Sequence, residues 1–390
     1  MPWTDVVGQD RAQQALRAAV AGGRVTHAYL LHGDQGAGTL AAALAFGQAL
    51  LCEAPRDGDA CGVCSACSRT TRLLHPDLQV YLPFPKVSKP ANKDDRPGDY
   101  ADRLAMIAED AYRVADYRRL AKIGDEEGSP KNAEHRIRPV EETLRSDMTM
   151  HAVEGGRRVG ILPDVDHMRR EAANSFLKLL EEPGPGVVLI LTAERLDNVL
   201  PTILSRCQRV RFDGLPPASV EAALVARGTD AATASFVARM AEGSLSRALQ
   251  LRDSEALADA RGLVVAFVRA AYGCRPTELG PLIETAAKKS RPALVRWLGY
   301  LQAWIRDLVL LRAVGADAPV VNVDQAETLS RFVAGVPAAD LAAMAQHVAD
   351  AAGLVEGNAN ATLVLTTLAH SLQAAMRGHG APLLVSLDAA

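Results

Sequence analysis

The chain has 390 residues, enough for two or three domains of ordinary size. Hydrophobic residues make up 48% of it, charged residues 23% and aromatic residues only 4%, which is typical of a helix-rich globular protein. The formal net charge of −3 excludes a chain that is basic throughout, so contact with nucleic acid would need a local basic patch or partner subunits.

The beginning of the chain shows no targeting signal. The first ten residues become polar within a few positions and contain no apolar core segment. No uncharged apolar stretch reaches the ~18 residues that a membrane-spanning helix needs. We therefore expect a cytoplasmic protein without membrane contact, whose six cysteines stay reduced.

Residues 1–213 are expected to form an α/β domain. Short runs of apolar and β-branched residues, typical of buried strands, alternate there with helix-forming segments. The expected strands are 28–32, 158–162 and 187–192. One expected helix follows the first strand and ends at about residue 51, and another covers 168–182. This alternation predicts a parallel sheet with helices on both faces.

A glycine-rich turn follows the first expected strand. It reads Gly33, Asp34, Gln35, Gly36, Ala37, Gly38, Thr39 and Leu40. A working phosphate loop, Gly-x-x-x-x-Gly-Lys-Ser/Thr, uses its lysine on the β- and γ-phosphates and its hydroxyl on Mg²⁺. Here Thr39 replaces the lysine, Leu40 replaces the hydroxyl residue, and Asp34 adds negative charge. Alone, this could be a plain structural turn; with the signals below we interpret it as a degenerate site that does not bind ATP.

The acidic element after strand 158–162 gives the same indication. An active ATPase of this kind has an aspartate for the metal and a glutamate directly after it, which polarises the attacking water. Asp164 is present, but Val165 follows it and Asp166 is one position too far along. We expect Asp166 to cap the following helix instead.

Four of the six cysteines fall in one short segment, with the spacing C-x8-C-x2-C-x2-C. They are Cys52, Cys61, Cys64 and Cys67. Four thiolates this close can surround one tetrahedral Zn²⁺ in a closed, structural site. Unrelated buried thiols and an iron–sulfur cluster are the alternatives. Cys207 and Cys274 are interpreted as packing or motif residues.

Residues 84–136 form a charged stretch interrupted by prolines and glycines. Apolar residues at near-helical spacing in 100–123 predict an inserted helix with flexible arms; a disordered loop is the alternative. From 214 onward the chain is expected to be helical. An apolar stripe on 294–311 fits either core packing or a subunit interface.

A Ser-Arg-Cys motif ends the α/β segment, at Ser205, Arg206 and Cys207. An arginine at a helix end can reach a neighbouring subunit's γ-phosphate and stabilise phosphoryl transfer, although a single arginine is more often a surface charge. With this motif, the chain resembles the bacterial clamp-loader subunits of the DNA polymerase III holoenzyme over most of its length. The matching segments are 5–9, 26–30, the four cysteines, 174–183 with Leu-Leu-Glu-Glu-Pro, and 204–207.

The resemblance implies three domains: an AAA+ domain over 1–213 with a zinc module at about 52–67, a helical lid over 214–252, and a collar over 253–390 that holds a pentameric ring. Active gamma/tau subunits keep the lysine and the Asp-Glu pair, whereas subunits of the delta-prime type commonly lack them and keep Ser-Arg-Cys. A non-hydrolysing delta-prime-type subunit is therefore implied, a component of the holoenzyme without intrinsic ATPase activity. Arg206 would act in trans, and the four cysteines would bind zinc.

The implied partners are gamma/tau and delta subunits, and, through the complex, the sliding clamp and primed DNA. Thr192 matches the sensor-1 position, while in the sensor-2 region a serine replaces the arginine and Arg247 is displaced by one residue. An active gamma/tau-type ATPase with a divergent phosphate loop is the alternative, which nucleotide binding by the isolated chain would favour. A zinc-dependent DNA-binding protein would need a basic face with stacking aromatic residues.

Overall fold

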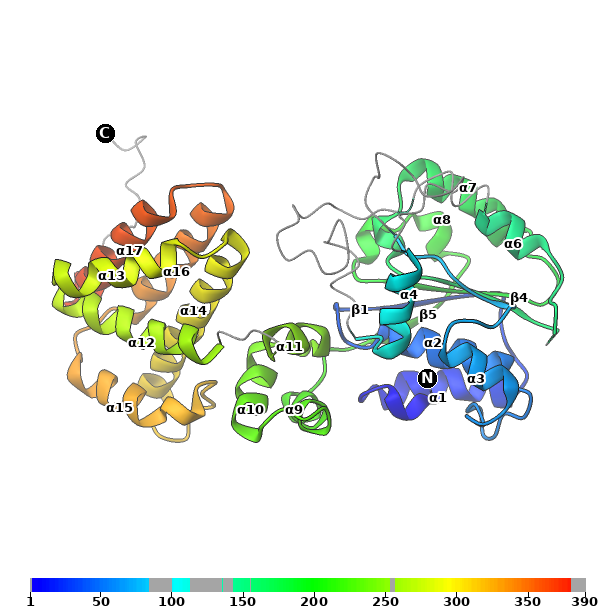
Figure 1. Cartoon of the computed structure of the whole chain (residues 1–390), viewed down its shortest axis with the longest axis horizontal. Coiled ribbons are helices and arrows are strands. Elements are labelled where there is room, and N and C mark those ends of the chain that lie inside the picture. Colours follow the sequence, from blue (N-terminus) through cyan, green and yellow to red (C-terminus); the bar gives the residue numbers. More distant parts are fainter. Residues whose placement is uncertain are drawn as a thin grey trace. The chain divides into compact units, whose positions relative to one another are not determined.

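The structure, a computed structural model, describes residues 2–83, 100–112, 135, 143–154, 156–252 and 257–379. The chain divides into two compact units (Figure 1). The first holds the residues up to Thr229 together with Ala241–Gln250. The second holds Asp230–Met240 and the residues from Leu251 onward.

The first unit is built on a five-stranded parallel sheet with the strand order β2-β3-β4-β1-β5. The strands are β1 (Ala28–Gly33), β2 (Leu78–Val80), β3 (Arg158–Leu162), β4 (Val187–Ala193) and β5 (Gln208–Phe212). All residues of β3 and β4 are buried, as expected for strands covered on both faces. The three predicted strands are confirmed, while β2 and β5 at the two edges were not predicted.

Helices cover both faces of the sheet (Figure 1). On one face lies α2, whose Gly47 packs over Val159 and Ile161 of β3. On the other, Phe176 and Leu179 of α7 pack with Leu189 and its neighbours on β4. Before the sheet's last strand, the described residues of this unit form the helices η1 (Trp3–Asp5), α1 (Asp10–Ala21), α2 (Thr39–Leu51), α3 (Ser65–Thr71), α4 (Tyr100–Glu109), α6 (Arg145–Thr149), η3 (Val165–His167), α7 (Arg170–Glu181), η4 (Leu196–Asn198) and α8 (Pro201–Leu204).

Three short helices follow the sheet: α9 (Pro217–Ala226), α10 (Ala231–Met240) and α11 (Leu245–Arg252). α9 and most of α11 belong to the first unit, whereas α10 belongs to the second. The residues of the predicted lid are thus divided between the two units, and the division into three domains stays a prediction.

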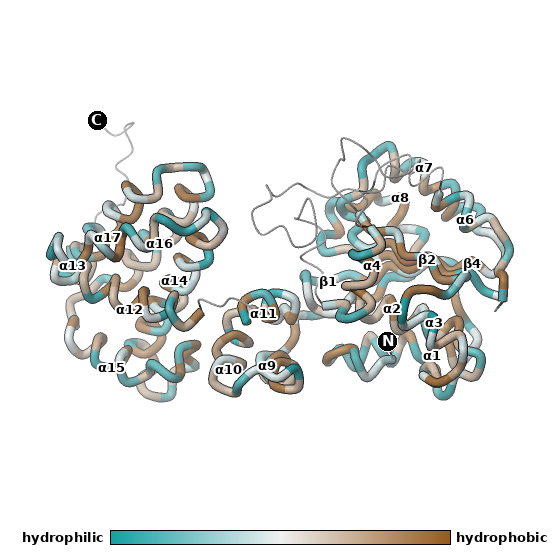
Figure 2. The backbone as a smooth tube through the Cα atoms, viewed as in Figure 1, coloured by the Kyte–Doolittle hydropathy of each residue, from teal (hydrophilic) through white to brown (hydrophobic). Residues whose placement is uncertain are grey.

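The second unit is helical throughout its described residues. Besides α10, its described helices are α12 (Leu257–Gly273), α13 (Pro276–Ala287), α14 (Arg291–Val314), η5 (Val323–Gln325), α15 (Ala326–Gly335), α16 (Leu341–Glu356) and α17 (Ala361–Met376). Leu294, Trp297, Leu301 and Leu308 of the apolar stripe are buried, so the stripe of α14 belongs to this unit's core. Figure 2 shows hydrophobic residues concentrated in the strands of the sheet, whereas hydrophobic and hydrophilic residues alternate along the helices. None of the helices in the described ranges is long and apolar enough to cross a membrane.

The parallel sheet with helices on both faces, followed by a helical unit, confirms the predicted fold class, an α/β domain of the AAA+ (P-loop NTPase-like) type with a helical C-terminal part. The helix predicted in the insertion is confirmed as α4, which begins at Tyr100. It ends at Glu109, so its predicted extension through residues 110–112 was wrong, and residues 113–123 lie outside the described residues. The hydroxyl of Tyr100 anchors α4 to the end of β2, through Val80 O at 3.1 Å and Leu82 N at 2.9 Å.

Candidate functional site

The glycine turn lies where three parallel strands end. It joins β1 to α2, with Gly36 and Gly38 at φ values of 81° and 104°. Asp164, two residues after the end of β3, donates its backbone N–H to the hydroxyl of Thr192 on β4 at 3.1 Å. The carboxyl edge of a parallel sheet is the usual place for a ligand site in such folds, so both sequence-predicted elements lie where a nucleotide would bind.

The cavity at the glycine turn encloses very little space. The cavity is lined by Gly33, Gln35, Gly36, Gly38, Thr39, Leu40, Ala41, Ala111, Tyr112, Asp164, Thr192, Ala193 and Glu194. Its volume of about 20 Å³ is roughly that needed for one water molecule. Leu40 is only 3% exposed and presents a methyl-bearing side chain where the phosphate loop needs a hydroxyl. The structure therefore gathers the predicted residues Gly33, Gly36, Gly38, Thr39, Leu40 and Asp164 around one small cavity.

Asp166 does not cap a helix, contrary to the prediction. The helix that follows, α7, has Arg169 at its N-cap and no side-chain cap. The short turn of η3 directs the Asp166 carboxylate back toward the loop after β4, where Oδ2 accepts the N–H groups of Glu194 at 3.2 Å and Arg195 at 3.1 Å. Asp166 therefore fixes a loop at the edge of the site.

Tyr112, from the insertion, lies directly on the glycine turn. A Cβ added to Gly38 would be 2.8 Å from the Tyr112 hydroxyl oxygen. That oxygen accepts the backbone N–H of Val7 at 2.9 Å. Burial raises the pKa of Tyr112 to about 12, so its hydroxyl is neutral at physiological pH. Sequence reasoning missed this residue, because only the spacing of apolar residues indicated that part of the insertion is ordered.

The start of α11 packs against the same turn. Leu245 donates its N–H to the carbonyl of Gly36 at 3.1 Å, and a Cβ on Gly36 would lie 2.2 Å from the Ser244 hydroxyl. Arg247, the displaced sensor-2 arginine, forms a 2.9 Å ion pair with Glu242. It is not among the described residues that line the cavity.

Arg206 follows the short helix α8 and is partly exposed. Its Nη1 donates to the carbonyl of Thr202 at 3.0 Å, and its Nη2 pairs with Glu181 Oε1 at 2.8 Å. Ser205 bonds through its hydroxyl to Thr202 O at 3.1 Å. Burial raises the pKa of Cys207 to about 12, and this thiol packs against the core beneath α7 and α8. The flanking residues thus fix the turn, while the guanidinium lies at the surface, away from the residues that line the cavity in the described chain.

The four cysteines of the predicted zinc module come together. Their sulfur atoms all lie within 4.8 Å of one another, and those of Cys61 and Cys67 are 3.9 Å apart. Tetrahedral Zn–S bonds of about 2.3 Å place sulfurs about 3.8 Å apart, so the cluster fits zinc with small adjustments.

Backbone amides around the cluster favour thiolates. Cys61 donates its N–H to Cys52 Sγ at 3.2 Å, and Cys64 donates to Cys61 Sγ at 3.4 Å. The N–H groups of Val63 and Cys64 lower the pKa of Cys61 to about 6, whereas burial raises the pKa of Cys52 and of Cys67. A bound divalent cation would hold all four cysteines as thiolates, because metal ligation requires deprotonated thiols.

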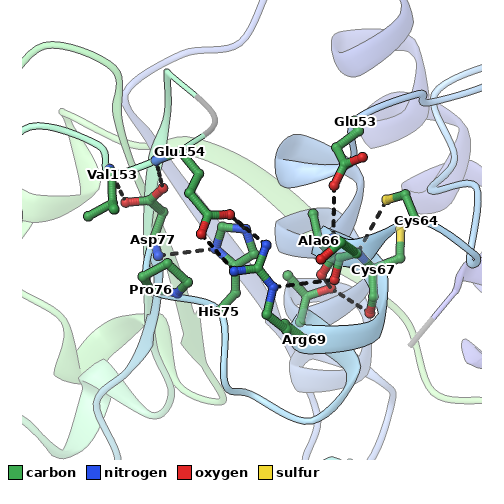
Figure 3. Close-up of polar contacts among 12 residues, drawn as sticks. Glu53, Cys64, Ala66, Cys67, Arg69, His75, Pro76, Asp77, Val153 and Glu154 are labelled. Carbon is green, nitrogen blue, oxygen red and sulfur yellow. Dashed lines mark hydrogen bonds and ion pairs between the residues drawn. The ribbon is translucent and has the colours of Figure 1, made fainter.

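A polar network connects this module to the sheet (Figure 3). Arg69 on α3 pairs with Glu154, with Nη1 at 2.7 Å from Oε1. The carboxylate of Asp77, just before β2, accepts the N–H groups of Val153 at 2.7 Å and Glu154 at 2.8 Å. His75 is buried beside this pair, and burial lowers its pKa. The network joins the cysteine module to the loop that enters β3.

Comparison with known proteins gives a family match. The family model described as "DNA polymerase III, delta subunit" matches residues 8–216, more than half of the chain. Among curated relatives, the DNA polymerase III subunit delta' of Bacillus subtilis is 26% identical over 257 residues, which cover 66% of this chain and 63% of the relative. The delta' subunit of Pseudomonas aeruginosa is 32% identical over 197 residues, covering 50% of this chain and 46% of the relative.

The chain is also similar to proteins with other names. The tau subunit of Escherichia coli is 27% identical over 271 residues, covering 67% of this chain and 34% of the relative. The match thus spans less than two thirds of the length of each of these three curated relatives. A solved structure of a DNA polymerase III gamma subunit-related protein from Thermotoga maritima aligns with 94% of this chain and 100% of its own, at 14% identity and a TM-score of 0.42.

Proposed function

The chain belongs to the family of DNA polymerase III delta-prime subunits, and from this membership we propose that it is a non-hydrolysing subunit of the clamp loader. In this proposal it assembles with gamma/tau and delta subunits. It supplies Arg206 to a neighbouring ATPase subunit while the complex loads the sliding clamp onto primed DNA. The predicted lid (214–252) contributes to the ring, and the collar (253–390) holds it together.

The absence of hydrolysis in cis is supported by the chemistry of the degenerate site. Thr39 carries no charge to place on the β- and γ-phosphates, and Leu40 has no oxygen for Mg²⁺. Asp164 is followed by Val165, so no adjacent carboxylate is available to polarise water. The observation that carries the proposal is the cavity of about 20 Å³ between these residues, which leaves room for about one water molecule.

The role of Arg206 in trans is supported by its exposure and its contacts. The side chain is 35% exposed, and its partner Glu181 is 49% exposed. Exposed ion pairs contribute only about 0–1 kcal/mol. Phosphate oxygens of a neighbouring subunit form stronger, charge-assisted hydrogen bonds with a guanidinium. Arg206 can therefore exchange Glu181 for a neighbour's γ-phosphate and stabilise the charge that develops during phosphoryl transfer.

The zinc of this proposal is structural. Cys52, Cys61, Cys64 and Cys67 would hold it, and a bound zinc supplies a cross-link between the end of α2 and the start of α3. Four thiolate ligands leave no coordination position for a substrate, so the site takes no part in catalysis.

The test is ATP turnover by the reconstituted loader with Arg206→Ala in this subunit. Trans-acting arginines in related reactions contribute roughly 10³–10⁵ in rate, so we expect turnover at the one ATP site that Arg206 serves to fall by at least about tenfold, and total turnover to fall by that site's share. Arg211→Ala is the matched control, because Arg211 is also a surface arginine near the sheet edge, paired with Asp213 at 2.8 Å. Unchanged turnover with Arg206→Ala, or an equal loss with Arg211→Ala, would refute the role of Arg206.

The similarity to tau subunits leaves an active gamma/tau-type ATPase with a divergent phosphate loop as the alternative. Calorimetry on the isolated chain separates the two functions. If the proposed function holds, the isolated chain gives no heat of Mg-ATP binding. If it is an active ATPase, it binds ATP tightly and this binding requires magnesium.

A further inference from the structure

The residues that line the degenerate site include two from the insertion, Ala111 and Tyr112. We propose that Tyr112 is a resident plug of this site, a barrier to nucleotide that acts independently of the lost ligands at Thr39 and Leu40. This inference rests on the proposed function, because it concerns why the site takes no nucleotide. It also gives a role to the described part of the insertion.

The plug lies against the glycine turn that holds phosphates in a working phosphate loop. There, phosphates are held by backbone N–H groups of the glycine turn and of the first turn of the helix. In this chain a Cβ on Gly38 would be 2.8 Å from the Tyr112 hydroxyl oxygen and 3.5 Å from two of its ring carbons. The phenol therefore touches the turn itself. Tyr112 is 1% exposed, so no solvent layer separates the two.

Three contacts hold the plug in place. The hydroxyl oxygen accepts the N–H of Val7 at 2.9 Å, which ties the ring to the N-terminal segment. The backbone N–H of Tyr112 donates to Asp110 Oδ1 at 2.9 Å. Arg227, at the end of α9, lies over the ring at 5.8 Å from its centroid and pairs with Asp110 Oδ2 at 3.4 Å. A buried aromatic ring fixed from three segments is an anchored part of the core.

The electrostatics around the plug also oppose an anion. Asp164 and Glu194 line the cavity and Asp34 is part of the turn, whereas the charge of Asp110 is balanced by Arg227. Burial raises the pKa of Tyr112 to about 12, so the phenol stays neutral and brings no cation to offset these carboxylates. Two separable causes thus exclude nucleotide: the chain lacks phosphate and magnesium ligands, and Tyr112 fills the space.

Two separable causes predict a specific pattern among variants of the full chain. T39K/L40T restores the cation and the hydroxyl, Tyr112→Ala removes the plug, and a third variant combines all three changes. Calorimetry with Mg-ATP should detect the tightest binding in the combined variant. We expect its dissociation constant to be at least about tenfold lower than that of T39K/L40T alone, since restored ligands are useful only when the phosphates can reach them.

The matched control is T39K/L40T with Tyr100→Ala. Tyr100 is a buried tyrosine of the same insertion, but it bonds to the end of β2 and does not line the cavity. This control should bind no better than T39K/L40T. If it binds as well as the combined variant, general loosening of the insertion explains the result and the plug is refuted.

Two other outcomes overturn the plug. One is Mg-ATP binding by T39K/L40T as tight as by the combined variant, which would mean that Tyr112 excludes nothing. The other is no binding by the combined variant when circular dichroism shows it folded. If the alanine variant does not fold, Tyr112→Val in the T39K/L40T background replaces it, and absence of binding then refutes the plug. Failure of the proposed function is a different result, Mg-ATP binding by the unaltered chain.

Discussion

Thr39 and Leu40 begin α2 at a turn whose backbone still passes through Gly36 and Gly38 with positive φ. Such values strain most residues but not glycine. Both positions also lack space for a side chain: a Cβ on Gly36 would meet Ser244, and one on Gly38 would meet Tyr112. The glycines therefore have a packing role that needs no nucleotide. The chain can therefore lack the phosphate and magnesium ligands at positions 39 and 40 and still keep the glycine turn. Ser244 and Tyr112 pack against the two glycines, and this packing does not involve the side chains of Thr39 and Leu40.

The cysteine cluster allows a prediction at the same scale. Cys64→Ser should remove the zinc, about one per chain in the unaltered protein, since serine is a poor zinc ligand. Serine keeps the cap of α3 that Cys64 now provides by accepting the N–H of Cys67 at 3.3 Å. Any loss of thermal stability then reports the metal and not the cap. The measurement is elemental analysis with thermal unfolding.

Cys207→Ser is the control for the zinc prediction. Cys207 packs with α7 and α8, outside the cluster, so this variant should keep its metal. Zinc retained after Cys64→Ser, or no zinc in the unaltered chain, would contradict the prediction.

Among the elements, central strands were predictable and edge strands were not. β3 and β4 are continuous apolar runs because both of their faces are covered. β5 has only two apolar residues, Val210 and Phe212, and β2 has only three residues, so both are too short to carry a strong pattern. The end of α4 was also not predictable. Periodic spacing of apolar residues predicted the helix, but the position of its end depends on tertiary contacts that the local sequence does not encode.

The candidate site shows the same limit. The glycine turn and the cysteine cluster are local motifs, so their residue types and spacing were enough to predict them. The contact of Tyr112 with Val7 joins residues 105 positions apart. The Arg206–Glu181 pair likewise joins residues 25 positions apart. Such pairs are set by the tertiary fold, and a single sequence gives no signal for them.

In the second unit, a prediction concerns the connection between α14 and α15. Asp307 on α14 is fully buried and accepts three hydrogen bonds of 2.8 Å, from the N–H groups of Val321 and Asn322 and from the Asn322 side chain. Asp307→Ala would leave two buried backbone donors without a partner, at a cost of roughly 3 kcal/mol. We expect the amide hydrogens of Val321 and Asn322 to exchange at least about tenfold faster.

Hydrogen exchange followed by mass spectrometry measures this effect. Asp307→Asn keeps one oxygen acceptor and should show a smaller increase. Asp317→Ala, an exposed aspartate in the same connection, is the control and should leave the exchange unchanged. Equal exchange in Asp307→Ala and the unaltered chain would show that the carboxylate does not hold this connection.

For the whole molecule, buried histidines couple stability to pH. Burial lowers the pKa of His75 and His135 in the first unit and of His347 in the second, from an ordinary value of 6.5. When a folded pKa is depressed in this way, the unfolded chain binds protons that the folded chain does not. The contribution of these histidines to the free energy of unfolding is complete above about pH 7.5. It is lost as the pH falls through 6.5 toward the folded pKa values, by up to about 1.4 kcal/mol per pH unit for each histidine.

His347 allows this coupling to be measured in one unit. It is 3% exposed on α16, and neither ring nitrogen has a hydrogen-bond partner among the described residues. In a Trp3→Phe background, the remaining tryptophans, Trp297 and Trp304, both report on α14 and so on the second unit alone. Urea unfolding followed by their fluorescence should show a lower free energy of unfolding at pH 5.5 than at pH 7.5. His347→Gln should reduce this difference, because glutamine binds no proton, whereas His370→Gln at an exposed site should not. An unchanged difference in His347→Gln would mean that the acid sensitivity of this unit comes from other groups.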